Sequence, residues 1–198
     1  MTPTRNETMS PTRTKATWKP GVFDEPVPFF RCPACHSVLA GIDGGTGPCL
    51  TGGGRRPVAE LPYAPAPTAP HCCGTPMERL PELSPDDTAA SLELSYDVVG
   101  GFDTNALRVS WSVKQAGCTP RWFALKTFTG LQLKYVVPGK LPPVVFALAD
   151  EDAYAYCDEN PCLSCTFHCK RGFVLYAYVE ETGLVAYPVH CEAPTSPP

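Results

Sequence analysis

The cysteines of this chain carry its most specific chemical signal. Cys32 and Cys35 form a Cys-x-x-Cys motif, and Cys72 and Cys73 are adjacent to each other on the far side of a long insert. A Cys-x-x-Cys turn lets two sulfur atoms point at one ion, and a second pair from a distant loop completes a tetrahedron. The spacing therefore predicts a four-thiolate metal site, and both zinc and iron suit such a site.

A second group of potential ligands lies nearer the C-terminus. It comprises a Cys-x4-Cys-x2-Cys-x3-Cys run, a histidine within that run and one upstream cysteine that a loop could bring close: Cys157, Cys162, Cys165, Cys169, His168 and Cys118. Such thiols suit a second zinc site, an iron–sulfur cluster or a thiol redox pair, or they bind no ligand, and the sequence leaves these alternatives open. Lys170 and Arg171 follow the run directly, where their charges could lower thiol pKa values or lie in solvent.

Metal binding explains Cys32, Cys35, Cys72 and Cys73 better than disulfide bonds do. The eleven cysteines are an odd number, and the first 28 residues lack the apolar core of a signal peptide. No apolar run approaches the roughly 20 residues that a spanning helix needs. We therefore expect a soluble, cytoplasmic protein without a membrane partner, in which clustered thiols stay reduced.

The charge pattern argues against nucleic acid as a partner. The formal net charge is −4, and no stretch interleaves aromatic residues with Lys and Arg.

The rest of the chain predicts an all-β protein, because 24 prolines and 16 glycines disfavour helices and favour turns. We expect a disordered arm over residues 1–28, a metal module with a Gly/Pro-rich insert over 29–80, a β-sandwich over 81–191 and a loose tail over 192–198.

Short runs of β-branched, aromatic and aliphatic residues separated by turn residues predict the strands of the sandwich. They cover residues 92–99, 107–113, 122–128, 131–137, 144–148, 153–156, 173–179 and 184–189. Three pairs of them read as hairpins across glycine-containing turns. The charged run at 150–152 could bind a divalent cation, but we expect a solvated loop there.

The cysteine spacing and the strand sequences together resemble the desulfoferrodoxin family. Cys32-x-x-Cys35 followed by Cys72-Cys73-Gly74-x-Pro76-Met77 is similar to the desulforedoxin-type module at the front of that family. The similarity to its superoxide reductase domain continues through five runs: Trp122-Phe123-Ala124-Leu125, Leu133-Lys134-Tyr135, Pro138-Gly139, Val145-Phe146-Ala147-Leu148 and Tyr154-Ala155-Tyr156-Cys157. The resemblance covers roughly residues 29–157 and implies a rubredoxin-like metal module followed by an immunoglobulin-like sandwich of about seven strands.

The resemblance implies that Cys32, Cys35, Cys72 and Cys73 bind one iron ion that shuttles a single electron. Our first hypothesis is that this electron passes to a rebuilt, cysteine-rich second site at Cys157 to Cys169. A rubredoxin-like carrier protein would then be the electron donor, and the module could pair into a homodimer. A structural zinc site without catalysis is the alternative reading of the same four thiols.

The family's catalytic site is where this sequence departs from the pattern. The family holds a second iron with four histidines and one axial cysteine, and the chain contains four histidines in all: His36, His71, His168 and His190. Two of these belong to the first module. Cys157 matches the axial cysteine, with Cys165 as another possible register, but Cys118 and Asn160 stand where histidines are expected. The usual superoxide-reducing site cannot be assembled, so the catalytic residues are unknown and any activity would need a rebuilt ligand set.

Overall fold

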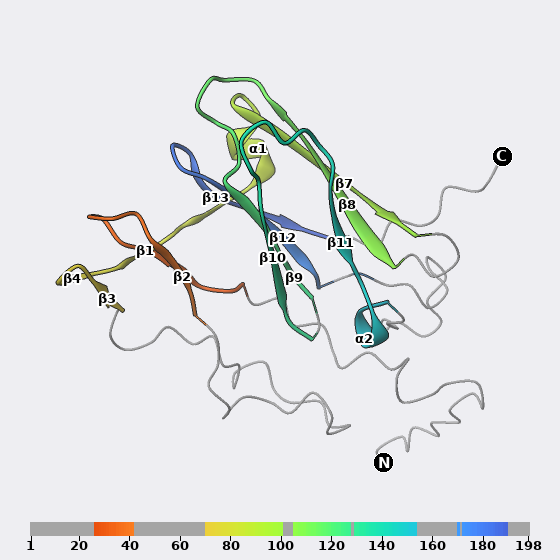
Figure 1. The fold of residues 1–198 in the computed structure, drawn as a ribbon, viewed down its shortest axis with the longest axis horizontal. Coiled ribbons are helices and arrows are strands. Elements are labelled where there is room, and N and C mark those ends of the chain that lie inside the picture. The colour runs from red at the N-terminus through yellow and green to blue at the C-terminus, as the bar shows by residue number, and fades with distance from the viewer. Residues whose placement is uncertain are drawn as a thin grey trace, which may run out of the picture.

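The described part of the chain is all-β, as predicted, with a four-cysteine cluster at one end. The computed structural model describes residues 26–41, 70–100, 105–127, 129–153, 170 and 172–189. These residues form four sheets and two one-turn helices (Figure 1). Within the described ranges, no helix has the length and apolar character that crossing a membrane requires.

The N-terminal module consists of very short strands. They are β1 (Phe29–Arg31), β2 (Val38–Ala40), β3 (His71–Cys72), β4 (Thr75–Pro76) and β5 (Glu78–Arg79). Three of them form a sheet in the order β2-β1-β5, and β3 and β4 form a separate hairpin. All of these pairings are antiparallel.

The sandwich follows, with two sheets of unequal size. Its elements are β6 (Glu82–Leu83), α1 (Pro85–Thr88), β7 (Leu92–Val99), β8 (Ala106–Val113), β9 (Trp122–Lys126), β10 (Leu131–Tyr135), β11 (Val144–Ala147), α2 (Asp150–Ala153), β12 (Val174–Val179) and β13 (Gly183–Pro188). One sheet has the order β10-β9-β12-β13-β6 and the other the order β11-β8-β7. Every pairing is antiparallel except that of β13 with β6.

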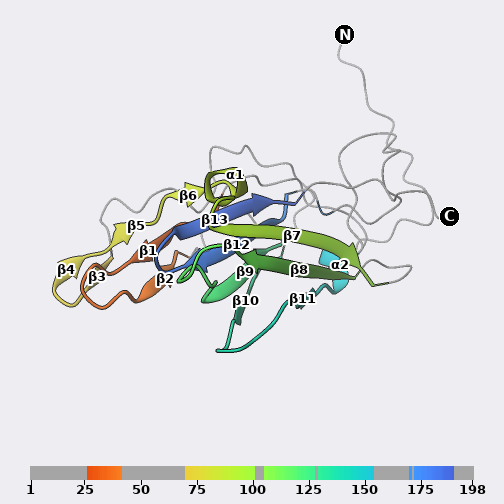
Figure 2. The ribbon, with the colours of Figure 1, turned by 90° about the horizontal axis from the view of Figure 1, so that it is seen from above.

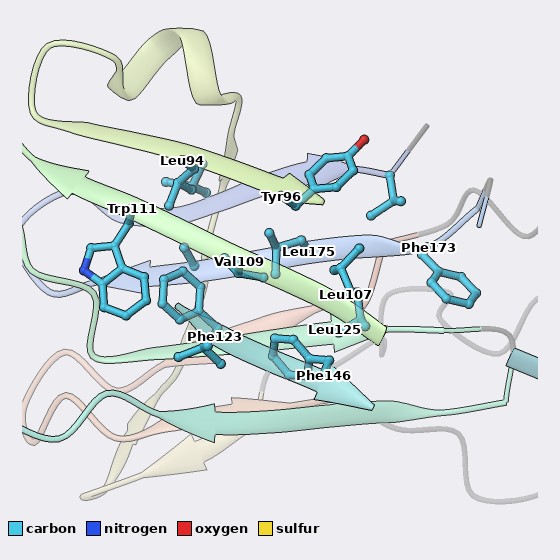
Figure 3. Close-up of a cluster of buried hydrophobic side chains, with 14 of the residues drawn as sticks. Leu94, Tyr96, Leu107, Val109, Trp111, Phe123, Leu125, Phe146, Phe173 and Leu175 are labelled. Atoms are coloured by element: carbon cyan, nitrogen blue, oxygen red, sulfur yellow. The ribbon is translucent and has the colours of Figure 1, made fainter. Parts of the chain in front are cut away.

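The main core lies between these two sheets. Alternate residues of β8, namely Leu107, Val109 and Trp111, are buried and point toward Phe123 and Leu125 of β9 (Figure 3). Period-2 burial of this kind is what a strand with one core face requires. Figure 2 shows β7 and β8 lying over the larger sheet, in agreement with the shared core.

Strand β12 is buried along its whole length, because both of its faces are covered. Leu175 and Ala177 belong to the core between the two sheets. Tyr176 and Tyr178 face the other way and contact a second cluster that includes Phe29 of the N-terminal module. The module thus forms a third layer on the outer face of the larger sheet, so the cysteine cluster is held against the sandwich.

The three predicted hairpins of the sandwich are confirmed. Strands β7 and β8 pair residue for residue across the turn that begins at Gly100, β9 pairs with β10, and β12 pairs with β13. Gly100 has a φ of 115°, and Gly183, which opens β13, has a φ of 112°; other residues rarely adopt such values. The glycine signals therefore located these turns correctly.

The prediction for residues 150–153 is wrong. The charged run expected to be a solvated loop forms the helix α2 together with Ala153, which was expected to begin a strand. Asp152 is buried, and its carboxylate accepts hydrogen bonds from the backbone nitrogen of Thr129 at 3.2 Å and from the Thr129 hydroxyl at 2.7 Å. This contact with the β9–β10 turn fixes the helical turn, and the spacing of charges along the sequence does not reveal it.

Candidate metal centre

The first half of the cluster is the turn between β1 and β2. The backbone nitrogen of His36 donates to the carbonyl of Cys32 at 3.0 Å, and the nitrogen of Cys32 donates to the carbonyl of Ser37 at 2.9 Å. His36 has a φ of 59°, which reverses the chain so that the two strands can pair. The turn places Cys32 at its base and Cys35 at its exposed tip.

The second half is the tight turn between β3 and β4. Cys72 pairs with Thr75 across this hairpin, so Cys73 and Gly74 are the two turn residues. Both have positive φ values, 53° and 75°, the combination that defines a type I′ hairpin turn. Cys72 therefore ends a strand while Cys73 occupies the first turn position. This arrangement lets the two adjacent thiols point toward one common site.

The two turns bring all four thiols together. The sulfur atoms of Cys32, Cys35, Cys72 and Cys73 lie within 4.8 Å of one another. The Sγ atoms of Cys35 and Cys72 are 3.6 Å apart, and those of Cys72 and Cys73 are 3.8 Å apart. A tetrahedral ion with metal–sulfur distances of about 2.3 Å requires sulfur separations of about 3.8 Å. The donor set therefore fits a single tetrahedral metal ion, and these cysteines could bind one.

The four thiols differ in their exposure to solvent. Cys32 is completely buried and packs with Phe30 and Met77 in a small cluster that Cys72 also joins. Cys35 and Cys73 are exposed. One side of the cluster therefore rests on apolar side chains, and the opposite side faces the surroundings.

The protonation of these thiols is uneven. Hydrogen bonds from the side chain and the backbone of Ser37, followed by those to Cys32 and Cys72, lower the pKa of Cys35 to about 6. Hydrogen bonding to Cys35, and then to Cys32 and Cys73, raises the pKa of Cys72 to about 12. The pKa of Cys73 is also raised, chiefly by its hydrogen bond to Cys35. At neutral pH the Cys35 thiolate thus lies beside the thiols of Cys72 and Cys73, which keep their protons, and a metal ion would have to displace those two protons.

Aromatic contacts anchor the module to the sandwich. The ring of Phe29 lies 5.4 Å from that of Trp122 and 5.2 Å from that of Tyr176, measured between centroids. The Tyr176 hydroxyl also accepts a hydrogen bond from the nitrogen of Val27 at 2.9 Å. Val27 is buried, although it belongs to the residues predicted to form a disordered arm. Most of that arm lies outside the described residues.

A polar contact joins the cysteine turn to the turn after β12. The Nδ1 atom of His36 lies 3.6 Å from a carboxylate oxygen of Glu180, and the Nε atom of Arg121 donates to the other oxygen at 3.0 Å. The hydrogen bond from Arg121, followed by that from His36, lowers the pKa of Glu180. The cysteine cluster therefore lies at the end of the sandwich where β12 finishes.

The second predicted cysteine group lies outside the described residues, except for Cys118. Cys157, Cys162, Cys165, His168 and Cys169 all belong to segment 154–169. A second metal site, an iron–sulfur cluster or a redox pair there stays a prediction.

The described residues that flank this segment meet each other. The ammonium of Lys170 donates to the carbonyls of Asp152 and Ala153 at 2.7 and 2.8 Å, and it lies 5.9 Å from the centroid of the Phe173 ring. Lys170 is 1% exposed, so of the two alternatives considered for its charge, a place in solvent is ruled out. Ala153 and Lys170, the described residues on either side of segment 154–169, are therefore in contact near the start of β12.

Cys118 lies at the other end of that strand. It is buried in the main core, and its sulfur accepts a hydrogen bond from the Thr182 hydroxyl, in the turn after β12, at 3.7 Å. Six residues of β-strand separate the two ends of β12, which is roughly 20 Å. The described structure therefore does not bring Cys118 to Ala153 and Lys170, where the cysteine-rich segment begins and ends. Both figures show α2 and the β3–β4 hairpin at opposite ends of the molecule (Figures 1 and 2).

Sequence reasoning missed Ser37, whose hydroxyl lies 3.2 Å from the Cys35 sulfur. Its position two residues after a cysteine is a weak signal, since the contact depends on the left-handed conformation of the intervening His36.

The fold and the cluster define an all-β protein with a candidate four-thiolate metal centre. No protein-family model matches the chain, and no curated protein sequence matches it. Among solved structures, the crystal structure of the superoxide reductase from Treponema pallidum is similar, with 17% sequence identity and a TM-score of 0.48. That match covers 82% of this chain and 97% of the other.

Proposed function

We propose that the protein is an electron-transfer protein in which Cys32, Cys35, Cys72 and Cys73 hold one iron ion. The convergence of the four sulfur atoms within 4.8 Å of one another carries this proposal. The adjacent Cys72 and Cys73 support iron, because the Cys-Cys-Gly sequence resembles the desulforedoxin-type module. An iron ion bound there would supply a one-electron change between its ferrous and ferric states.

The protein's own residues account for the other requirements of such a centre. Cys32, Phe30 and Met77 exclude water from the inner side of the cluster. The exposed thiols of Cys35 and Cys73 leave the outer side open to another molecule. We propose a rubredoxin-like carrier as the electron donor that meets this exposed side. The anchoring of Phe29 on the sandwich keeps the turn region in place while such a partner binds.

The test is metal analysis combined with electron paramagnetic resonance on protein isolated without oxygen. We expect one iron per chain at this centre and a ferric-thiolate colour that a reductant bleaches. The Cys32→Ser variant should lose that colour, and the Cys118→Ser variant should keep it, because Cys118 lies in the sandwich core. Zinc as the sole metal in protein from iron-replete cells would contradict the proposal.

A structural zinc site is the second candidate. It is favoured by the small size of the apolar cluster beneath the thiols, which consists of Phe30, Cys32 and Met77 with Cys72 against it. So few buried side chains give a module little stability of its own, and a tetrahedral zinc ion would supply the missing folding free energy. This alternative predicts a colourless protein whose module loosens on chelation and shows no response to reductants.

A further inference from the structure

One hydroxyl group distinguishes the two cysteine turns. In the first turn, the Ser37 oxygen lies 3.2 Å from the Cys35 sulfur. In the second turn, the comparable hydroxyl of Thr75 donates instead to the backbone carbonyl of Cys72 at 3.0 Å. Ser37 therefore contacts a candidate metal ligand directly, whereas Thr75 contacts the chain that carries one.

The backbone holds Ser37 in this place. Its carbonyl accepts a hydrogen bond from the nitrogen of Cys32 at 2.9 Å, and it directly precedes Val38, which pairs with Arg31 in the β1–β2 sheet. The φ of 59° at His36 reverses the direction of the chain, so that Ser37 lies next to Cys35. The distance between hydroxyl and sulfur is thus set by the turn itself.

The direction of this hydrogen bond depends on the state of the sulfur. A protonated Cys35 can donate to the serine oxygen, but a thiolate can only accept, so the hydroxyl must then donate to it. Metal binding requires the thiolate, so the same direction applies in the metal-bound protein.

We propose that Ser37 raises the reduction potential of the metal centre by donating a hydrogen bond to the Cys35 thiolate. This inference rests on the proposed function, since only a redox-active ion has such a potential. Hydrogen bonds to the sulfur ligands are one of the factors that set the potential of iron–thiolate centres. A donor favours the reduced centre, because the sulfurs carry more negative charge after one electron has been added and charge-assisted hydrogen bonds strengthen accordingly.

The test is a redox titration of the full-length protein reconstituted with iron, with potentials compared among variants. For Ser37→Ala we expect a more negative potential, equivalent to a fall of about three- to tenfold in the equilibrium constant for reduction, where tenfold is 59 mV for one electron. Ser37→Thr keeps a hydroxyl, so its reduction potential should lie close to that of the unchanged protein. Thr75→Val removes the hydroxyl that bonds a carbonyl and should leave the potential close to that of the unchanged protein.

Each outcome decides the inference. An unchanged or more positive potential in Ser37→Ala would overturn it, and so would an equal shift in Thr75→Val. Cobalt-substituted protein provides a separate readout, because the thiolate-to-cobalt absorption band should move in Ser37→Ala and stay in place in Thr75→Val. If the isolated protein contains zinc while reconstituted Ser37→Ala shows the shift, the proposed function fails and the role of Ser37 stands. If neither iron nor cobalt binds through the four thiols, both fail.

Discussion

The ionisable side chains at the two ends of the sandwich differ in their exposure to solvent and in their hydrogen bonding. At the end where β12 finishes, the thiols of Cys35 and Cys73 lie in tight turns and are exposed. At the end where β12 begins, Asp152 and Lys170 are buried and bound by neighbouring backbone and hydroxyl groups. Groups that are open to a ligand and close to one another can do chemistry, whereas buried groups with satisfied hydrogen bonds hold the chain together. Among the described residues, the cysteine end is therefore the candidate site, whereas Asp152 and Lys170 have a structural role.

The largest expected effect concerns the attachment of the cysteine end. Phe29→Ala should lower the free energy of unfolding by about 3–5 kcal/mol, because a buried aromatic ring is lost against Trp122 and Tyr176. Urea denaturation measures this effect. Phe29→Leu, which keeps most of the apolar volume, should cost clearly less. Equal stability of Phe29→Ala and the unchanged protein would show that the module does not depend on this contact.

Removal of the metal should change amide hydrogen exchange at the cysteine end and leave it unchanged in the sandwich. Chelation of the loaded protein should speed amide hydrogen exchange in β1 to β5 by about 100-fold, the equivalent of about 2.7 kcal/mol from a ligand at 100 times its dissociation constant. The amides of β9 and β12, which lie in the centre of the larger sheet, should exchange at unchanged rates. Mass spectrometry of peptides from both regions provides the measurement. Faster exchange in β12 of similar size would mean that the two ends form one cooperative unit.

The lysine end can be tested with two lysines that differ in burial. Lys170→Met should destabilise the protein by about 2 kcal/mol, since the carbonyls of Asp152 and Ala153 lose their donor inside the protein. Lys134 is exposed and lies 5.8 Å from the centroid of the Phe146 ring. Lys134→Met should cost less than about 1 kcal/mol. Thermal unfolding of both variants compares them directly, and similar losses would remove the distinction between the two ends.

The smallest effect is a change of one proton in metal binding. The pKa of Cys35 is lowered to about 6, so this thiol is already deprotonated above that pH and must release its proton below it. The affinity of the metal-free protein for zinc should therefore fall by one additional factor of ten per pH unit below pH 6. Above pH 7 the released protons come from groups that include Cys72 and Cys73, whose pKa values are raised.

Calorimetry in buffers of different ionisation enthalpy counts these protons at each pH. In Ser37→Ala the pKa of Cys35 should rise, and the step should move to higher pH. A proton count that stays constant from pH 5 to pH 7 would show that Cys35 does not carry the thiolate.

The cysteine cluster could be predicted because each of its halves is a local turn with the spacing of metal ligands, although Cys35 and Cys72 lie 37 residues apart. Cys32 and Cys35 share one turn, and the glycine after Cys73 permits the positive φ that a two-residue hairpin needs. The strands of the sandwich were predictable for the same reason, since alternation along β7 and β8 reflects the two faces of each strand.

The opposite end could not be predicted, because its contacts join distant parts of the chain and no motif of ligand-like spacing marks the residues that make them. Asp152 bonds Thr129, which is 23 residues away, and Lys170 bonds a carbonyl 18 residues away. Charged residues are usually exposed, and only the folded arrangement shows that these two are not. The Ser37 contact was missed for a subtler reason, since it requires a non-glycine residue, His36, in the left-handed region.

Strand β12, which runs between the two ends, is mechanically rigid. It is hydrogen-bonded on both edges, to β9 and to β13, and it is covered on both faces. A strand held in this way cannot stretch or slide without breaking the sheet, so it works as a rigid spacer. It fixes the separation between the turn that contacts His36 and the point at which Lys170 binds the carbonyls of Asp152 and Ala153.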